Sequence, residues 1–181
     1  MNDRTQEQPA AAEPEGIAQM ISFSIGPEEF GVKILMIQEI IMIPEITEIP
    51  NSPDFVEGVI NLRGDIIPIL DLRKRLRLRG VDVIVERSQG NRILVVEIDG
   101  NVSGFIVDSV SKVLTVPASK MMPPPDIIEA GVQSQYISGV VHLDDRILVI
   151  LDFRRILSVE EKDVLERVPK MIPEQPRTSF S

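Results

Sequence analysis

The sequence contains no cysteine and no tryptophan, and it has a single histidine, His142, among its 181 residues. The absence of cysteine excludes disulfide bonds, thiolate chemistry and cysteine-based metal sites. One histidine, with no cysteine to accompany it, cannot complete a first-row metal site. His142 lies inside a strand-like run, so we interpret it as a packed or edge residue. We expect neither a metal ion nor a cofactor.

Aromatic residues are scarce, and acidic residues outnumber basic ones. Aromatics make up 4% of the chain against 43% for all hydrophobic residues, so the core must be aliphatic and β-branched, which suits strands. The net charge of −9 argues against bulk nucleic-acid binding. The longest apolar stretch, Ile34–Ile43, is broken by Gln38 and Glu39 and is too short to span a bilayer, and the polar N-terminus shows no secretion signal. We therefore expect a cytoplasmic protein without direct membrane insertion.

One segment of the chain occurs twice. Residues 58–76 read GVINLRGDIIPILDLRKRL and residues 139–157 read GVVHLDDRILVILDFRRIL, so each residue of the second copy lies 81 positions after its counterpart. A second pair, GVKILMIQEII from Gly31 and GFIVDSVSKVL from Gly104, has an offset of 73. A repeat of this length predicts two copies of one small fold. Two modules present separate faces and a groove between them, which suits bridging of partners better than a single reaction centre.

Short apolar runs separated by turn signals predict β-strands throughout the repeats. Asp99-Gly100-Asn101 is a strong hairpin signal, and Arg63-Gly64-Asp65 marks another turn. The apolar runs are nearly continuous, which indicates strands covered on both faces or apolar surface that awaits a partner. Regularly spaced short strands predict a mainly β fold of two closed or nearly closed barrels.

The domain limits that we expect follow the repeat. They are a disordered tail at 1–17, a first barrel at about 18–80, a second barrel at about 91–157, a helix at 158–168 and a flexible tail at 169–181. The polar segment 81–91 links the two barrels. Ser158 and Glu161 form the capping-box pattern that begins the helix.

Motifs of catalysis are missing, since the sequence has neither a glycine-rich phosphate loop nor a nucleophile elbow. Asp71 and Asp152 occupy the same position of the repeat, and a pair of this kind could in principle form an acid dyad. Each is followed by an arginine-rich stretch, however, and we predict that each carboxylate caps the turn after its strand. We therefore expect no enzymatic activity.

Residues 73–79, RKRLRLR, concentrate positive charge in an acidic protein. One hypothesis is a docking patch for anions or acidic proteins, and the alternative function is an anion-binding or nucleic-acid-binding double barrel that uses this run. The other hypothesis, which we favour, is a solvated face from which Leu76 and Leu78 point inward. No aromatic residue is interleaved as a stacking platform for bases.

Arg63 and Glu39 interrupt otherwise apolar strands of the first copy, where the second copy has Asp144 and Lys112. Arg63 is therefore not needed merely to build the turn, although Gly64 beside it allows a positive φ. We hypothesise that Arg63 and Glu39 pair across neighbouring strands. An ordinary surface ion pair is the equally weighted alternative.

These segments resemble the CheW family of chemotaxis coupling proteins. The matching pieces, in the family's order over residues 20–157, are FSIGPEEFGVKILMIQEI, FVEGVINLRGDIIPILDLR, GFIVDSVSKVL, the prolines at 123–125 and DDRILVILD. The resemblance implies that residues 18–157 form one CheW-like domain of two five-stranded, SH3-like β-barrels packed side by side. Asp144 departs from the family, which has glycine at this turn.

The resemblance also implies a function without enzymatic activity or nucleic-acid binding. Proteins of this family join the cytoplasmic tips of methyl-accepting chemoreceptors to the regulatory domain of the histidine kinase CheA, in rings that further copies of the chain can join. Glu39 and Arg63 match the family's charged partner-binding pair, and Val110 and Val113 match a receptor-facing strand. The complete set of partner-binding positions is Ile37, Glu39, Gly58, Arg63, Gly64, Val110 and Val113.

Overall fold

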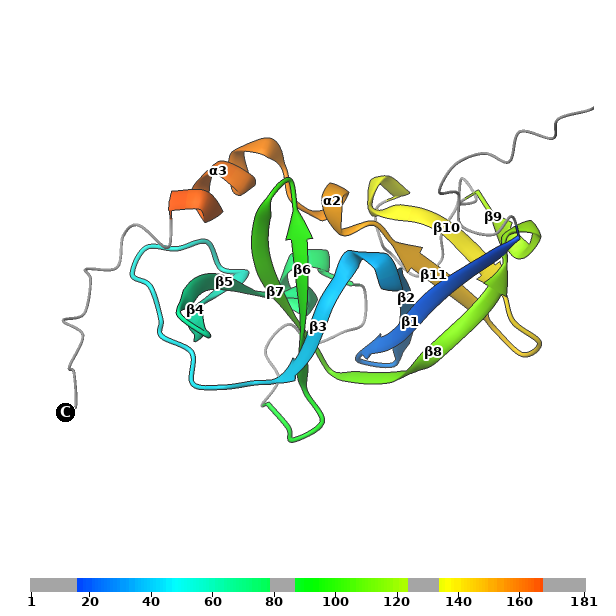
Figure 1. The fold of residues 1–181 in the computed structure, drawn as a ribbon, viewed down its shortest axis with the longest axis horizontal. Coiled ribbons are helices and arrows are strands. Elements are labelled where there is room, and N and C mark those ends of the chain that lie inside the picture. The colour runs from blue at the N-terminus through cyan, green and yellow to red at the C-terminus, as the bar shows by residue number, and fades with distance from the viewer. Residues whose placement is uncertain (1–15, 79–86, 124–133, 168–181) are drawn as a thin grey trace, which may run out of the picture.

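The computed structural model describes residues 16–78, 87–123 and 134–167, and the strands in these ranges form two sheets (Figure 1). Sheet A, on the right of Figure 1, has the strand order β8 (Ser109–Pro117), β1 (Ile17–Ile25), β2 (Glu28–Lys33), β11 (Ile147–Leu151), β10 (Ile137–His142) and β9 (Met121–Met122). Sheet B, on the left, has the order β3 (Ile37–Met42), β6 (Arg92–Ile98), β7 (Asn101–Val107), β5 (Asp65–Asp71) and β4 (Val56–Leu62). The prediction of a mainly β fold is confirmed.

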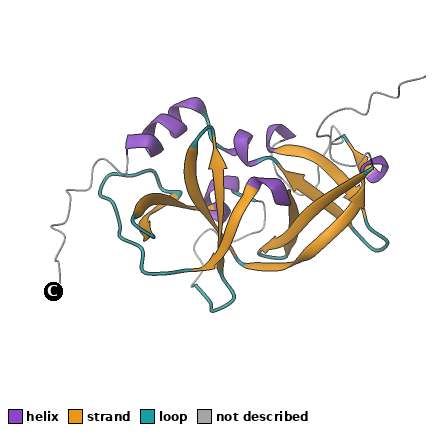
Figure 2. Ribbon diagram, in the orientation of Figure 1, coloured by secondary structure: helices purple, strands orange, loops and turns teal. Residues whose placement is uncertain are grey.

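Helices are short, and all but α3, which follows α2, directly precede or follow a strand (Figure 2). They are η1 (Ile34–Met36), α1 (Leu72–Leu76), η2 (Ala118–Lys120), η3 (Ser134–Tyr136), α2 (Phe153–Ile156) and α3 (Val159–Arg167). The capping box is formed at the start of α3, because Glu161 N donates to Ser158 Oγ and Ser158 N donates to Glu161 Oε2, both at 3.1 Å. No helix among the described residues is long and apolar enough to cross a bilayer.

The strands do not follow the expected division into barrels at about 18–80 and about 91–157. Hairpin β1–β2 of the first repeat belongs to sheet A, where it pairs with β8 and β11 of the second repeat. Hairpin β6–β7 of the second repeat belongs to sheet B, with β3, β4 and β5 of the first. The repeats therefore exchange their hairpins, and the chain passes between the sheets before β3 and again before β8.

The limits of the expected tails and linker fall largely outside the described residues. The tail at 169–181 lies wholly outside them, and so does most of the linker at 81–91. Of the N-terminal tail at 1–17, residue 17 already belongs to β1.

Three apolar clusters hold the molecule together. Sheet B has its own cluster, which includes Ile60 and Ile69, and sheet A has a cluster with their repeat counterparts Val141 and Ile150. The third and largest cluster contains side chains from both sheets. Its aromatic centre is formed by Phe23, Phe30, Phe105 and Phe153. These four phenylalanines thus gather where the two sheets meet, and this shared core fixes the sheets relative to each other.

Candidate partner-binding site

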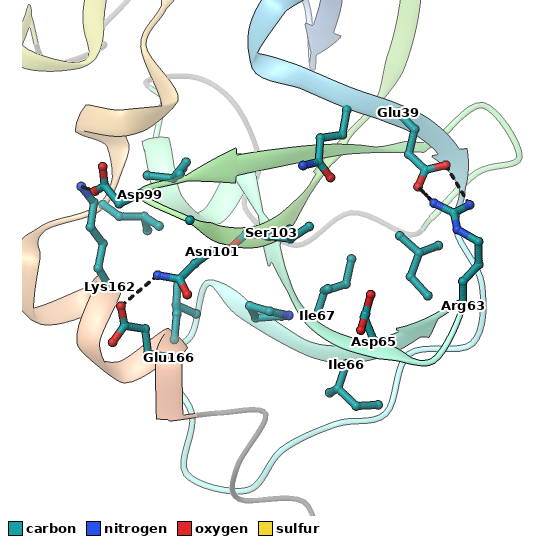
Figure 3. A pocket seen from close by; sticks show the side chains of 18 residues that line it. Glu39, Arg63, Asp65, Ile66, Ile67, Asp99, Asn101, Ser103, Lys162 and Glu166 are labelled. Carbon is teal, nitrogen blue, oxygen red and sulfur yellow. Dashed lines mark hydrogen bonds and ion pairs between the residues drawn. The ribbon is translucent and has the colours of Figure 1, made fainter.

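Glu39 and Arg63 form an exposed ion pair at one end of sheet B (Figure 3). Glu39 lies on β3 and Arg63 in the turn between β4 and β5, and Nη1 of Arg63 donates to Oε2 of Glu39 at 3.2 Å while Nη2 donates to Oε1. The hypothesis that the two side chains pair is confirmed, but not between neighbouring strands, because β3 and β4 are the opposite edges of sheet B. The pair therefore links the two edges of the sheet.

The electrostatics of the pair favour a fixed guanidinium. The hydrogen bond from Arg63 to Glu39, reinforced by the charge of Glu39, raises the pKa of Arg63 above its ordinary value. The Arg63 side chain is nevertheless 72% exposed, against 28% for Glu39. A cation that is held in one place and still accessible can bind a partner without first being ordered.

The turn that carries Arg63 has an unusual backbone. Arg63 and Gly64 have φ values of 51° and 94°, so both lie in the left-handed region, as a two-residue type I′ turn requires. Asn61 supports the turn, because its Oδ1 accepts a hydrogen bond from Gly64 N at 2.8 Å. Asparagine and glycine suit the first turn position better than arginine does. The turn is therefore compatible with arginine at this position but does not require it.

A hollow of about 330 Å³ adjoins the ion pair and has α3 as one wall (Figure 3). Two polar contacts hold α3 there: Lys162 Nζ lies 3.2 Å from Asp99 Oδ2, and Asn101 Nδ2 donates to Glu166 Oε1 at 2.9 Å. The sequence predicted the helix through its capping box. It contained no signal for where the helix packs, and the contribution of α3 to the site was missed.

The other predicted site residues fall into two groups. Ile37 lies half-buried on β3 near Glu39, where it packs against the shared core. Gly58 is internal to β4 with a φ of 144°, and a β-carbon there would overlap the carbonyl oxygen of Thr47, so its role is in the backbone. Val110 and Val113 lie on β8 at the edge of sheet A, and Val113 is 53% exposed. The predicted positions thus occupy both sheets.

The repeat gives the ion pair a counterpart of reversed charge. Lys112 stands at the position equivalent to Glu39, and Asp144 stands at that of Arg63. Both line a second hollow, of about 240 Å³, on sheet A. The two sheets therefore present equivalent corners with opposite arrangements of charge.

Three cations of the basic run, Arg73, Lys74 and Arg75, are neutralised by acidic residues of the protein itself. Arg73 is buried and paired with Asp108, Lys74 lies 2.5 Å from Glu57, and Arg75 lies 3.1 Å from Glu161. The prediction that Leu76 and Leu78 point inward is confirmed, since both are buried. The run is less solvated than expected, however, because Arg73, Lys74 and Arg75 hold structural contacts, whereas Arg77 is exposed. A general anion-binding patch loses its main support, and residue 79 lies outside the described residues.

The two equivalent aspartates act as caps after their strands, as predicted, and what each caps is a short helix rather than a turn. Asp71 Oδ1 accepts from Arg73 N at 2.9 Å and from Lys74 N at 3.3 Å at the start of α1. Asp152 Oδ1 accepts from Arg154 N at 3.0 Å at the start of α2. Burial raises the pKa of Asp71. Asp71 is the last residue of β5 in sheet B, and Asp152 directly follows β11 in sheet A. Each aspartate therefore caps a helix of its own.

Comparison with known proteins gives consistent matches. A family model described as CheW-like domain matches residues 19–161. The chain is 36% identical over 152 residues to the chemotaxis protein CheW of Klebsiella aerogenes, covering 84% of this chain and 89% of that protein. It is 32% identical over 143 residues to the chemotaxis protein CheW of Treponema pallidum, covering 79% and 84%. The crystal structure of the scaffolding protein TtCheW from Thermoanaerobacter tengcongensis aligns with a TM-score of 0.72 at 32% identity, over 86% of this chain and 96% of that one.

Proposed function

Because the chain belongs to the CheW family, we propose that it is a non-enzymatic coupling protein that links chemoreceptor tips to the regulatory domain of the histidine kinase CheA. The similar proteins of Klebsiella aerogenes and Treponema pallidum are chemotaxis proteins, and TtCheW is a scaffolding protein. The observation that carries the proposal is the exposed, prearranged Glu39–Arg63 pair beside a hollow of sheet B. The proposed role places the protein in the cytoplasm, at receptor arrays.

The kinase domain is the partner that we assign to the Glu39–Arg63 corner. The exposed guanidinium can add hydrogen bonds to a partner while Glu39 holds it in place. Apolar surface lies close by, since Ile40, next to Glu39 on β3, is 38% exposed, and Ile66 lines the hollow. A charged group beside apolar surface is the usual composition of an interface centre and its rim.

The receptor tip is the partner that we assign to the apolar surface of β8. Val113 is exposed and Val110 is half-buried on this edge strand of sheet A. The repeat makes Val113 equivalent to Ile40 on β3, so each sheet carries one exposed aliphatic residue at the same place. Two separate apolar surfaces on one rigid body are what a protein needs in order to hold two partners together.

Further copies of the chain can join the same assembly. The corner with Glu39 and Arg63 is complementary in charge to the equivalent corner with Lys112 and Asp144. Contacts between two different faces of identical molecules propagate head to tail, and they close into rings when the rotation permits. Many weak contacts in such an array raise the effective concentration of every partner.

The test is binding of the full chain to a kinase regulatory domain and to a receptor signalling fragment, separately and together. Arg63→Ala should weaken binding to at least one of them and leave the fold intact. Arg155→Ala is a matched control, because it removes an exposed arginine of α2 that pairs with Asp152, the N-cap of that helix. Unchanged binding of Arg63→Ala to both partners would contradict the assignment of this residue. Failure of the unaltered chain to bind either partner would contradict the coupling function itself.

A further inference from the structure

Helix α3 is the wall of the hollow that lies across from the Glu39–Arg63 pair. Figure 3 shows Lys162 and Glu166 of α3 on one side of the hollow and the ion pair on the other. The floor between them belongs to sheet B, since residues of β5 and β7 also line the hollow. The position of α3 therefore sets how much of sheet B a partner at the ion pair can reach.

The first turn of α3 is firmly anchored. Arg75 Nη2 lies 3.1 Å from Oε2 of Glu161, and the same oxygen accepts the capping-box hydrogen bond from Ser158 N. The guanidinium of Arg75 lies over the rings of Phe55 and Tyr136, at 5.5 Å and 5.2 Å from their centroids. Tyr136 stands 81 positions after Phe55, so equivalent aromatics of the two repeats hold one arginine. The N-terminal end of α3 is thus fixed to both repeats.

The remainder of α3 is held much less firmly. Among the α3 side chains that the structure describes, Leu165 is the buried one, at 6% exposed. Lys162 pairs with Asp99, which is 67% exposed, and the hydrogen bond between Asn101 and Glu166 is exposed as well. Exposed ion pairs contribute little to stability, and a helix of nine residues is marginal on its own in water. Docking of this part of α3 therefore depends mainly on one leucine.

Apolar surface of sheet B is shielded by the docked helix. Ile98 and Leu165 both belong to the shared apolar cluster and both line the hollow, and Ile98 is buried. Leu62, next to Arg63, and Ile66 line the same hollow. Movement of Leu165 away from the sheet would join Ile98 to this lining, and a partner at Arg63 would then bury a larger apolar area.

We propose that α3 is a strap that regulates the Glu39–Arg63 site. Docked on sheet B, it narrows the hollow, and the kinase regulatory domain binds tightly when the C-terminal part of the helix swings away about its anchored first turn. This inference rests on the function proposed above and adds a regulation of the same site. Closure lowers the apparent affinity by the fraction of chains that are open, so a strap open in about a tenth of the chains weakens binding about tenfold.

The first test removes the leucine that docks the strap. Leu165→Ala should increase the affinity of the full chain for the kinase regulatory domain about tenfold, as measured by isothermal titration calorimetry. Val164→Ala is the matched control, because it removes an exposed aliphatic side chain from the same helix and should leave the affinity unchanged. Unchanged or weaker binding of Leu165→Ala would overturn the strap.

The second test locks the strap on the sheet. The chain has no cysteine, so Asn101→Cys with Glu166→Cys can be joined selectively by a bismaleimide whose linker contains a disulfide. The locked chain should bind the kinase domain at least about tenfold more weakly than the same chain after a reductant has cleaved the linker. Both halves of the linker stay attached after cleavage, so the comparison isolates the tether. Equal affinity before and after cleavage would overturn the proposal.

A third measurement needs no partner and separates the strap from the proposed function. In amide hydrogen exchange, α3 should open locally while β6 and β7 stay protected, and Leu165→Ala should speed the exchange of α3 alone. Exchange of α3 only together with these strands would overturn the strap, whether or not the kinase domain binds. Local opening of α3 in a chain that fails to bind the kinase domain would contradict the proposed function and not the opening of the strap.

Discussion

Ile150 of β11 occupies the space that a β-carbon on Gly31 of β2 would need. The two residues are paired in a parallel ladder, and such a β-carbon would lie 2.6 Å from Cδ1 of Ile150. The same relationship occurs in the other sheet, where Gly104 is paired with Ile69 and a β-carbon would lie 2.7 Å from Cδ1 of Ile69. Each of these pairings joins a strand of one repeat to a strand of the other, so these glycines hold the exchanged hairpins in place.

Substitution at either glycine should therefore destabilise the whole chain. Gly31→Ala and Gly104→Ala should each lower the free energy of unfolding by about 1–3 kcal/mol, because a side chain forces its isoleucine neighbour from a packed position. Denaturation by urea measures this. Gly90→Ala is the control, since a β-carbon there meets only ordinary contacts, the nearest at 3.6 Å from the carbonyl oxygen of Asp108. Equal losses at all three positions would contradict close packing as the cause.

The repeat predicted which residues are equivalent but not which sheet each hairpin joins. Equivalences such as Asp71 with Asp152 and Ile69 with Ile150 are all realised in the structure. A hairpin that stays with its own repeat and one that is exchanged contain the same local strand pairs and bury the same residues, so sequence spacing cannot distinguish them. The exchange depends on where the chain goes after β2 and β7, which is decided by packing between the sheets.

The candidate site was predictable in part for a similar reason. Charged residues within apolar strands stand out, and the pairing of Glu39 with Arg63 could be anticipated. Their position at opposite edges of sheet B could not, because it depends on the order of strands in the sheet. The packing of α3 beside the pair rests on contacts of Asp99 and Asn101 with residues of the helix far along the chain. No local pattern encodes such contacts.

The half-buried cap Asp71 should make stability depend on pH. Its pKa in the folded state is raised above the ordinary value of 3.8 by burial. The folded state therefore binds a proton more readily than the unfolded state, and ionisation of Asp71 costs stability as pH rises through this interval. Asp71→Asn keeps a good capping residue without the charge.

The stability of Asp71→Asn relative to the unaltered chain should accordingly increase from acid towards neutral pH, over the interval between 3.8 and the raised pKa. Urea denaturation across this interval measures the difference, and Asp152→Asn at the equivalent cap is the matched variant. A difference that stays constant with pH would show that the carboxylate of Asp71 ionises alike in both states.

The ion pair of Arg73 with Asp108, at the crossing from β7 to β8, offers a test of buried charge. Asp108→Asn leaves Arg73 with a neutral acceptor in a largely buried position, and we expect a loss of about 2 kcal/mol in the free energy of unfolding. Asp144→Asn removes an exposed aspartate elsewhere and should change stability by less than about 0.5 kcal/mol. A small effect at both positions would show that the Arg73–Asp108 pair contributes little to joining the sheets.

The sharpest test of the site separates the turn from the charge at residue 63. Arg63 has a left-handed backbone, which asparagine adopts readily, so Arg63→Asn should preserve the turn and the stability of the fold while it removes the guanidinium. If the side chain binds the kinase regulatory domain, affinity should fall about tenfold, as expected for an arginine near the centre of an interface. Isothermal titration calorimetry measures the affinity, and a thermal melt shows whether the fold is intact.

Lysine is the informative second substitution at residue 63, because Arg63→Lys keeps the charge but loses the two parallel hydrogen bonds to Glu39. An affinity of Arg63→Lys close to that of the unaltered chain would show that charge alone matters, whereas an affinity close to that of Arg63→Asn would show that the orientation set by Glu39 is what the partner recognises.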